Sequence, residues 1–206
     1  MKQINEPQSA PPGLPHGIPA TGADFTHVLG DYDCGNLDHE FSARLIRFKD
    51  LKGTFGRGAD GRRHYQGFFA ELLADYLLGS AMFANCLLMA PVPPKRGQDP
   101  DDYHLFDLAS GLEAEYERRK EAHRLQIEFE ALKFTGEVPP VKSIRLPDRP
   151  CALESRIACT MELSGRSVIL LDDIIASGAT AAECVRALRE AGAEKVGLVA
   201  LARRVA

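Results

Sequence analysis

The segment "VILLDDIIASGAT", residues 168–180, joins an apolar run to two adjacent aspartates and a short polar turn. Val168–Leu171 have the continuous apolar pattern typical of a strand that is covered on both faces of a parallel sheet. Asp172 and Asp173 follow this strand directly, and the turn "ASGAT" precedes a segment with helical spacing. Because ligands bind at the carboxyl ends of the strands in open parallel sheets, we expect a ligand site here.

The residue types of this segment suit a phosphorylated sugar. Two neighbouring carboxylates such as Asp172 and Asp173 repel each other, so ribose hydroxyls or a Mg²⁺ ion are partners that favour the pair. The hydroxyls of Ser177 and Thr180, with backbone amides at a helix start, can surround a phosphate. Gly178 permits close approach of the backbone. The alternative is an ordinary strand, turn and helix with two solvated aspartates and a hydroxyl cap.

Predicted strands and helices alternate along the rest of the chain. Strands are expected at 25–33, 85–94, 141–146, 156–163, 168–171 and 196–202, and helices at 37–53, 64–79, 103–124 and 181–191. Residues 125–134 fit a strand or a helix equally well. The alternation favours an α/β fold with a mainly parallel central sheet flanked by helices. We expect a flexible arm rich in Pro and Gly at 1–23 and one domain at 24–206, with 103–140 as an inserted hood segment.

Composition narrows the class of protein. The 206 residues carry a net charge of −4, and 45% of them are hydrophobic. This balance does not favour a broadly basic surface that binds nucleic acid, and no run of about 18 apolar residues is present to span a membrane. The first residues lack the apolar core of a signal peptide, so a cytoplasmic location is expected. The five cysteines are widely spaced without a CxxC pair, which argues against a zinc ribbon or a disulfide framework.

The segment 168–180 resembles the binding motif for phosphoribosyl pyrophosphate (PRPP) of type I phosphoribosyltransferases. The resemblance implies that fold, and it implies that Asp172 and Asp173 hold the ribose hydroxyls and a Mg²⁺ ion. It assigns the 5-phosphate to the turn residues Ala176, Ser177, Gly178, Ala179 and Thr180. Family members that act on 6-oxopurines usually carry an Asp where this chain has Ala176, which counts against hypoxanthine–guanine chemistry.

Two further segments resemble binding loops of the same family. The segment "MAPVPPKRG", residues 89–97, is similar to the strand and loop that bind pyrophosphate, which implies a role for Pro94, Lys95 and Arg96. A solvated basic turn is the alternative. The order of segments places the family's basic closing loop near 146–156, with Arg145, Arg149 and Arg156 as candidate phosphate ligands. An ordinary surface loop is the alternative reading of each of these arginines.

The order of segments is most similar to the ComF-like branch of the family. "FKDLKG" and "FFAELLADYL" precede "PVP", and the chain ends near "ARR". Members of that branch carry an N-terminal zinc-binding Cys cluster, whereas this chain has a proline-rich segment there, so a direct role in DNA uptake is not expected. The family resemblance also implies a homodimer.

The activity implied by the resemblance is transfer of a phosphoribosyl group (a pentosyl transfer, the chemistry of glycosyltransferases) to a nitrogen acceptor with release of pyrophosphate. Two alternatives stay open. One is a regulator that senses PRPP or a nucleotide without catalysis, because binding a sugar phosphate does not supply an acceptor pocket. The other is an accessory protein in DNA processing that uses the basic stretch 48–64; nucleic acid is a less favoured partner.

Overall fold

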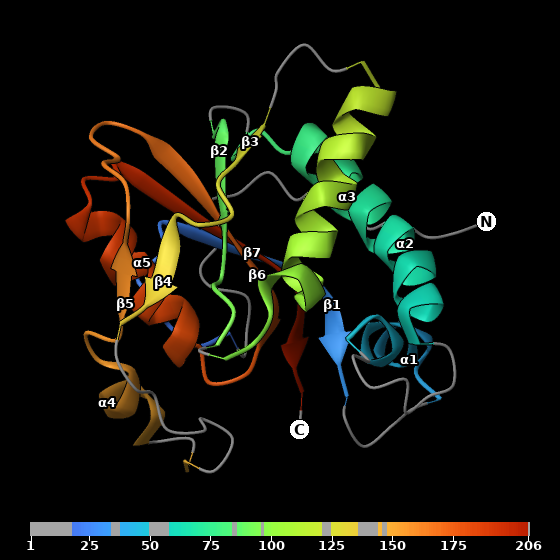
Figure 1. Cartoon of the computed structure of the whole chain (residues 1–206), viewed down its shortest axis with the longest axis horizontal. Helices are drawn as coiled ribbons and strands as arrows, with labels where there is room; N and C mark the ends of the chain where they lie inside the picture. The colour runs from blue at the N-terminus through green and yellow to red at the C-terminus, as the bar shows by residue number, and fades with distance from the viewer. Residues whose placement is uncertain are drawn as a thin grey trace.

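The computed structural model describes residues 18–33, 38–49, 58–83, 86–95, 97–120, 125–135, 144–145 and 148–205. Its centre is a five-stranded sheet in which every neighbouring pair of strands is parallel (Figure 1). In spatial order the strands are β1 (Phe25–Tyr32), β7 (Lys195–Arg204), β6 (Ser167–Ile175), β2 (Leu88–Pro91) and β3 (Gln126–Ile127). The predicted α/β fold with a mainly parallel sheet is confirmed.

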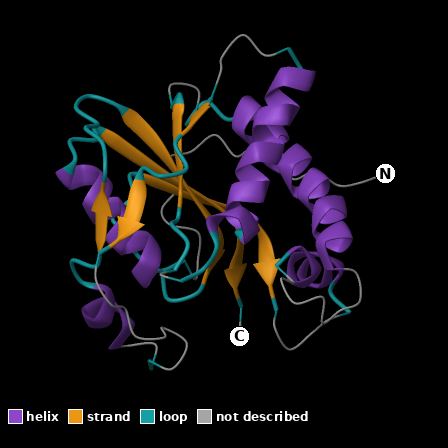
Figure 2. Cartoon of the chain, in the orientation of Figure 1, coloured by secondary structure: helices purple, strands orange, loops and turns teal. Residues whose placement is uncertain are grey.

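Helices cover both faces of the sheet (Figures 1 and 2). One face carries α1 (Glu40–Phe48), α2 (Gly58–Gly79) and α3 (His104–Arg118), which follows a 3-10 turn at Pro100–Asp102. The other face carries α5 (Ala179–Glu190), α4 (Arg149–Leu153) and an antiparallel hairpin of β4 (Leu132–Phe134) and β5 (Ile157–Cys159). None of the helices in the described ranges is long and apolar enough to cross a lipid bilayer.

The core forms where the apolar central strands meet these helices. Val168–Leu171 on β6 and Leu198–Ala202 on β7 are almost fully buried, as expected for strands covered on both faces. On the helical side, fully buried side chains recur three or four residues apart, which is the spacing of one helix face. They include Phe69 and Leu73 on α2 and Leu105, Leu108 and Leu112 on α3.

The sheet has a step at its carboxyl edge. β2 pairs with β6 only as far as Pro91 opposite Leu171, whereas β6 continues along β7 to Ile175. The sequence prediction that this strand ends at Leu171 is therefore wrong. Proline has no N–H to donate to the ladder, so β2 ends at Pro91, and Pro93 and Pro94 follow it. β7 still offers backbone partners to β6 beyond this point. Asp172 and Asp173 thus lie inside β6, on the part that has a strand on one side only.

Other boundaries depart from the sequence prediction as well. The ambiguous segment 125–134 contributes two short strands, β3 in the main sheet and β4 in the hairpin. α2 begins at Gly58 instead of residue 64. Of the strand predicted at 141–146, only residues 144–145 are described, and they form no strand. In the predicted arm, residues 1–17 lie outside the described part, whereas Ile18 and Thr21 are buried.

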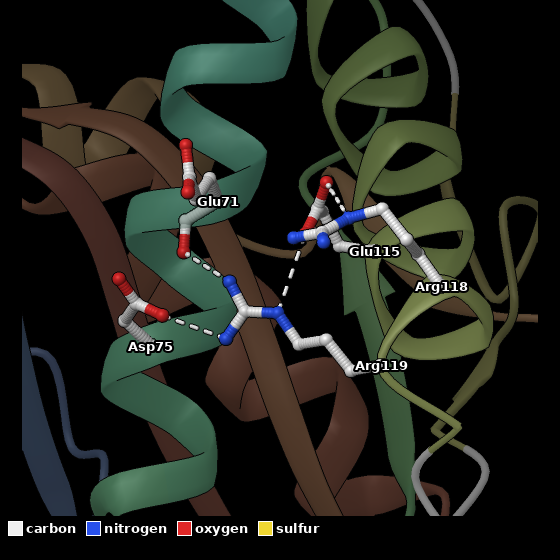
Figure 3. Close-up of polar contacts among 5 residues, drawn as sticks. All are labelled: Glu71, Asp75, Glu115, Arg118 and Arg119. Carbon is white, nitrogen blue, oxygen red and sulfur yellow. Dashed lines mark hydrogen bonds and ion pairs between the residues drawn. The ribbon is translucent and has the colours of Figure 1, made fainter.

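A network of charged side chains joins α2 to α3 on the surface (Figure 3). Arg119, which follows the last residue of α3, donates to Asp75 at 2.6 Å and to the backbone oxygen of Glu71 at 3.4 Å, both on α2. The same guanidinium lies 3.3 Å from the Glu115 carboxylate on α3. The adjacent Arg118 also binds Glu115, at 2.7 Å, but within its own helix. Arg119 is therefore the residue of this network that ties the two helices together.

We expect Arg119→Ala to lower the free energy of unfolding by about 1 kcal/mol, because it removes a partly shielded cation shared by two helices. Urea unfolding at low and high salt measures this loss, which should shrink as salt screens the charges.

Arg118→Ala is the matched control, since it removes an arginine from the same carboxylate without breaking a contact between helices. Equal losses for the two variants would show that the contact across the helices contributes nothing to stability.

Candidate functional site

The two acids lie at the step of the sheet. The last backbone bond that β6 receives from the β2 side runs from the Val92 N–H to the Leu171 oxygen, at 2.8 Å. Asp172 is opposite Ala200 of β7 in the ladder and is buried, with 8% of its surface exposed. Its Oδ1 accepts the backbone N–H of Asp173 at 2.8 Å. The end of β2 therefore opens one side of β6 at the first of the two acids.

Asp173 is held by two side chains from the helical face. Lys49 Nζ and His104 Nε2 each lie 2.5 Å from the same oxygen, Oδ2 of Asp173. The other oxygen, Oδ1, accepts the backbone N–H of Ile174 at 2.5 Å. A carboxylate offers about four lone-pair positions, so these three donors leave room for about one more, on Oδ1.

The packing of α1 places Lys49 at the acid pair. Leu45 and Phe48 are completely buried, which fixes the last turn of the helix. Lys49 follows as the C-cap residue, and its N–H donates to the Leu45 oxygen at 3.0 Å. A cation at this end of a helix is favoured by the helix dipole. The Phe48 ring also meets the His104 ring edge-on, with centroids 5.7 Å apart, so both donors to Asp173 share one packed unit.

His104 is the first residue of α3. Leu105 and Leu108 on the same helix are completely buried, and Tyr103 before it is 6% exposed. Because Nε2 donates to Asp173, Nδ1 is the acceptor nitrogen of the neutral ring, and within the described residues this buried atom has no hydrogen-bond partner. The position also brings Asp173 to the start of α3, where exposed amides favour an anion.

The two acids differ in their electrostatic surroundings. Burial and the neighbouring Asp173 charge raise the pKa of Asp172 to about 7. Burial also acts to raise the pKa of Asp173, but the Lys49 charge and the His104 hydrogen bond outweigh it and hold that pKa well below its ordinary value. Asp173 is therefore the ionised member of the pair, and Lys49 compensates its charge. Among the described residues, Asp172 is a buried acid without a cation at comparable distance.

The predicted phosphate turn leads from β6 into α5. Gly178 is the N-cap residue of α5 with φ 72°, in the left-handed region that glycine adopts without strain. The first backbone bond within the helix runs from Ala182 N–H to the Gly178 oxygen, so the amides of residues 179–181 precede it. The Ala179 amide lies 3.4 Å from Ser177 Oγ, and Thr180 is half-buried. This helix start offers the donors that an anion requires.

The structure corrects the role that the sequence suggested for Gly178. A Cβ atom at this residue would lie 2.8 Å from Pro19 Cγ and 3.3 Å from Thr21 Cγ2. The close approach at Gly178 is thus made by the chain's own segment 18–21, and not by room for a ligand on that side. The amides of residues 179–181 and the Thr180 hydroxyl remain as the candidate phosphate-binding groups of the turn.

The other predicted binding residues are placed less completely. Pro94 and Lys95 follow β2 at the carboxyl edge, with Pro94 half-buried and Lys95 exposed, and Arg96 lies outside the described residues. Arg145 is exposed and binds Asp148 at 2.9 Å. The Arg149 side chain is also outside the described part. Arg156 lies at the base of the hairpin, where its backbone oxygen accepts the Thr135 N–H at 2.8 Å.

Sequence reasoning missed Lys49 and His104 as members of the site. Lys49 belongs to "FKDLKG", a segment that drew notice only for its basic character and its order along the chain. His104 is 69 residues away from Asp173 along the chain, and no sequence motif distinguishes it from the other histidines. No local signal marked Lys49, which lies inside the helix predicted at 37–53, whereas His104 is the second residue of the helix predicted at 103–124.

The acid pair is a poor fit for a directly bound Mg²⁺ ion. Mg²⁺ requires near-octahedral oxygen ligands at about 2.0–2.1 Å, and Oδ2 of Asp173 already receives two nitrogen donors. In the part of the chain that the structure describes, no three His, Cys, Asp or Glu side chains form a group that could hold a metal ion. A ribose hydroxyl fits better, because it needs only the remaining position on Oδ1 or an oxygen of Asp172.

Comparison with known protein families gives a match over the C-terminal part of the chain. Residues 133–206 match the family described as the phosphoribosyl transferase domain. The match covers β5, β6, α5 and β7, and so it includes both acids and the turn, whereas Lys49 and His104 lie before it. No curated protein matches the chain significantly.

The raised pKa of Asp172 predicts how stability depends on pH. The unfolded chain releases this proton near the ordinary Asp value, whereas the folded chain keeps it up to about pH 7. The folded state therefore binds more protons between these values, and its stability falls as the pH rises through this window. Asp172→Asn should remove this contribution, so that the variant gains on the order of 1–3 kcal/mol relative to the parent chain between pH 5 and pH 8.

Urea unfolding at about pH 5 and about pH 8 measures the free energy of unfolding of each variant. Glu130→Gln is the control, because Glu130 is an exposed acid on the hairpin that binds Lys133. If Asp172→Asn and the parent chain lose stability in parallel, Asp172 is not a buried acid with a raised pKa.

Proposed function

We propose that this chain is a type I phosphoribosyltransferase, which binds PRPP and transfers its 5-phosphoribosyl group to a nitrogen acceptor, with release of pyrophosphate. The family match supports phosphoribosyl transfer in general. The observation that carries the proposal is the order of groups along β6. An acid pair on its open edge is followed by a turn and by the first amides of α5, which have no acceptor within the helix.

In this proposal the two acids bind the ribose. Asp172 and the remaining position on Oδ1 of Asp173 receive the ribose hydroxyls, because carboxylate oxygens are strong acceptors and ribose offers two adjacent donors. Lys49 and His104 hold Asp173 in place, so its orientation does not change when the sugar arrives. The acids position the sugar and do not attack it.

The start of α5 binds the 5-phosphate. The amides of residues 179–181 and the hydroxyls of Ser177 and Thr180 donate to it, and the helix dipole adds to the attraction. The pyrophosphate group is assigned to the loop after β2, where Lys95 is exposed. A Mg²⁺ ion, which the family resemblance implies, is assigned to the pyrophosphate of the ligand, where phosphate oxygens supply the ligands that the acid pair does not.

The reaction breaks the bond from C1 of the ribose to pyrophosphate and forms a bond from C1 to the acceptor nitrogen. The bonding pair leaves with pyrophosphate, the nitrogen lone pair forms the new bond, and the nitrogen then loses a proton to solvent. The work of the protein is to position the sugar and to stabilise the charge that develops on the leaving group. A base or an amine is the proposed acceptor class.

Sensing without catalysis is the second candidate. The observation that favours it is that the described site residues account for the sugar and the phosphate, both of which a sensor also binds. The finer parts of the main proposal, a ComF-like relationship, a homodimer and a cytoplasmic location, follow from the sequence resemblance and composition. Sedimentation of the purified chain tests the dimer. In the basic stretch 48–64, residues 50–57 and the side chains of residues 58–63 lie outside the described part, so no structural argument supports DNA binding.

The double variant Asp172→Asn, Asp173→Asn should abolish PRPP binding while leaving the fold intact, because two neutral amides replace the acceptors of the ribose hydroxyls. Calorimetric titration with PRPP measures binding, and circular dichroism checks the fold. Unchanged affinity would remove the acids from the site.

Pyrophosphate release should then be assayed across a panel of bases and amines. If the parent chain releases pyrophosphate with an acceptor and the double variant does not, the result supports the proposal that the chain is an enzyme. Tight PRPP binding without release from any acceptor supports the sensor.

Thr180→Val should weaken PRPP binding about tenfold, because it removes one hydrogen bond to a charged phosphate. Thr160→Val is the matched control, since its hydroxyl donates to the Glu130 oxygen in the hairpin, at 2.7 Å. If both variants bind PRPP as the parent chain does, Thr180 has no part in holding the phosphate.

A further inference from the structure

The contact between Lys49 and Asp173 has a consequence for metal dependence. A ribose-binding acid pair carries negative charge in a partly buried place, which is costly unless a cation compensates for it. Here the compensating charge comes from the chain itself, because Lys49 Nζ lies 2.5 Å from Oδ2 of Asp173. The oxygen that a divalent cation would use is thus occupied before any ligand binds.

We propose that Lys49 is a built-in cation of the sugar site, which lets the acid pair bind a ribose phosphate without a divalent metal ion. The inference rests on the proposed function, since it concerns the same site. It also gives Lys49 a role in binding that the family match, which begins at residue 133, does not cover.

The surroundings of Lys49 support a permanent contact. The last turn of α1 is fixed by the fully buried Leu45 and Phe48, so the lysine backbone is held where its side chain reaches Asp173. His104 donates to the same oxygen, and its ring packs on Phe48, which holds the carboxylate in one orientation. A tethered ammonium is always present at the acid, whereas Mg²⁺ must first give up bound water. The internal cation therefore competes well against an external one.

The same contact has an opposite reading, in which Lys49 blocks the site and must leave before the sugar binds. About a third of the lysine side chain is exposed (32%), so the ammonium has a path to solvent. The fourth lone-pair position of Asp173, on Oδ1, stays open to a sugar hydroxyl while Lys49 remains bound. This arrangement favours the built-in cation, and the two readings predict opposite effects when the lysine is removed.

The test is calorimetric titration with ribose 5-phosphate, which lacks the pyrophosphate that would bring its own Mg²⁺. The parent chain should bind with affinities that differ by less than about twofold between EDTA and Mg²⁺ buffers, because the acid pair needs no metal. Lys49→Met should bind at least about tenfold more weakly in EDTA, and Mg²⁺ should restore part of the loss. Lys49→Arg, which keeps the charge, should stay close to the parent chain.

Arg47→Met is the matched control, since it removes a cation from the same turn of α1, where Arg47 donates to the Tyr65 hydroxyl instead. A thermal melt checks that each variant folds, and Lys49→Gln replaces Lys49→Met if the latter does not. A second readout is Mn²⁺ binding to the free chain, followed by electron paramagnetic resonance. Removing Lys49 should tighten Mn²⁺ binding about tenfold, because it frees one lone-pair position on Oδ2 of Asp173 and removes a competing positive charge.

Three outcomes would overturn the inference. Ribose 5-phosphate binding by the parent chain that requires Mg²⁺ contradicts the built-in cation but leaves the proposed function standing. Tighter ligand binding by Lys49→Met in EDTA shows that the lysine blocks the site. A parent chain that binds neither ribose 5-phosphate nor PRPP in either buffer removes the proposed function together with this inference.

Discussion

β2 and β6 separate at the carboxyl edge of the sheet, and the site depends on this separation. Up to Leu171 the central strand has a neighbour on each side, and after it only β7 remains. The cause is local, because Pro91, Pro93 and Pro94 cannot continue a hydrogen-bonded ladder. The open edge begins at Asp172, so polar side chains appear where backbone pairing ends, and the strand then runs on to the turn that starts α5.

Placing two carboxylates at such an edge is costly unless each is compensated, and the helical face supplies the compensation unequally. Lys49 and His104 come from the end of α1 and the start of α3, and both reach one oxygen of Asp173. Asp172 receives the Asp173 backbone amide, but burial and the Asp173 charge outweigh it and the Lys49 charge, so its pKa shifts in the opposite direction. The packing of Phe48 against Phe69 and His104 therefore contributes to the electrostatics of the site as well as to the core.

The part of the site that lies within one continuous segment could be predicted from the sequence. Hydrophobic pattern and turn chemistry identified the buried run before Asp172, the turn that contains Gly178 and the helix after it. The end of β6 could not be predicted, because it depends on the length of β7 and on the prolines of β2. Lys49 was equally hidden, since its contact with Asp173 arises only when α1 packs beside the sheet.

The segment 18–21 is a second example of a contact that local sequence could not predict. Nothing in the local sequence shows that Pro19 would lie against Gly178, a contact between residues far apart in the chain. The close approach that glycine permits at residue 178 is made by the side chains of Pro19 and Thr21. Local motifs thus predicted which residue types form the site, and tertiary packing decided which faces of them are available.

The central claim is that one strand presents an acid pair to a sugar and then a helix start to its phosphate. A crystal structure of the chain with ribose 5-phosphate tests it most directly. The account predicts the phosphate against the amides of residues 179–181 and the ribose hydroxyls against Asp172 and Oδ1 of Asp173. A phosphate bound away from the start of α5, or a sugar that leaves both acids without a hydroxyl partner, would contradict it.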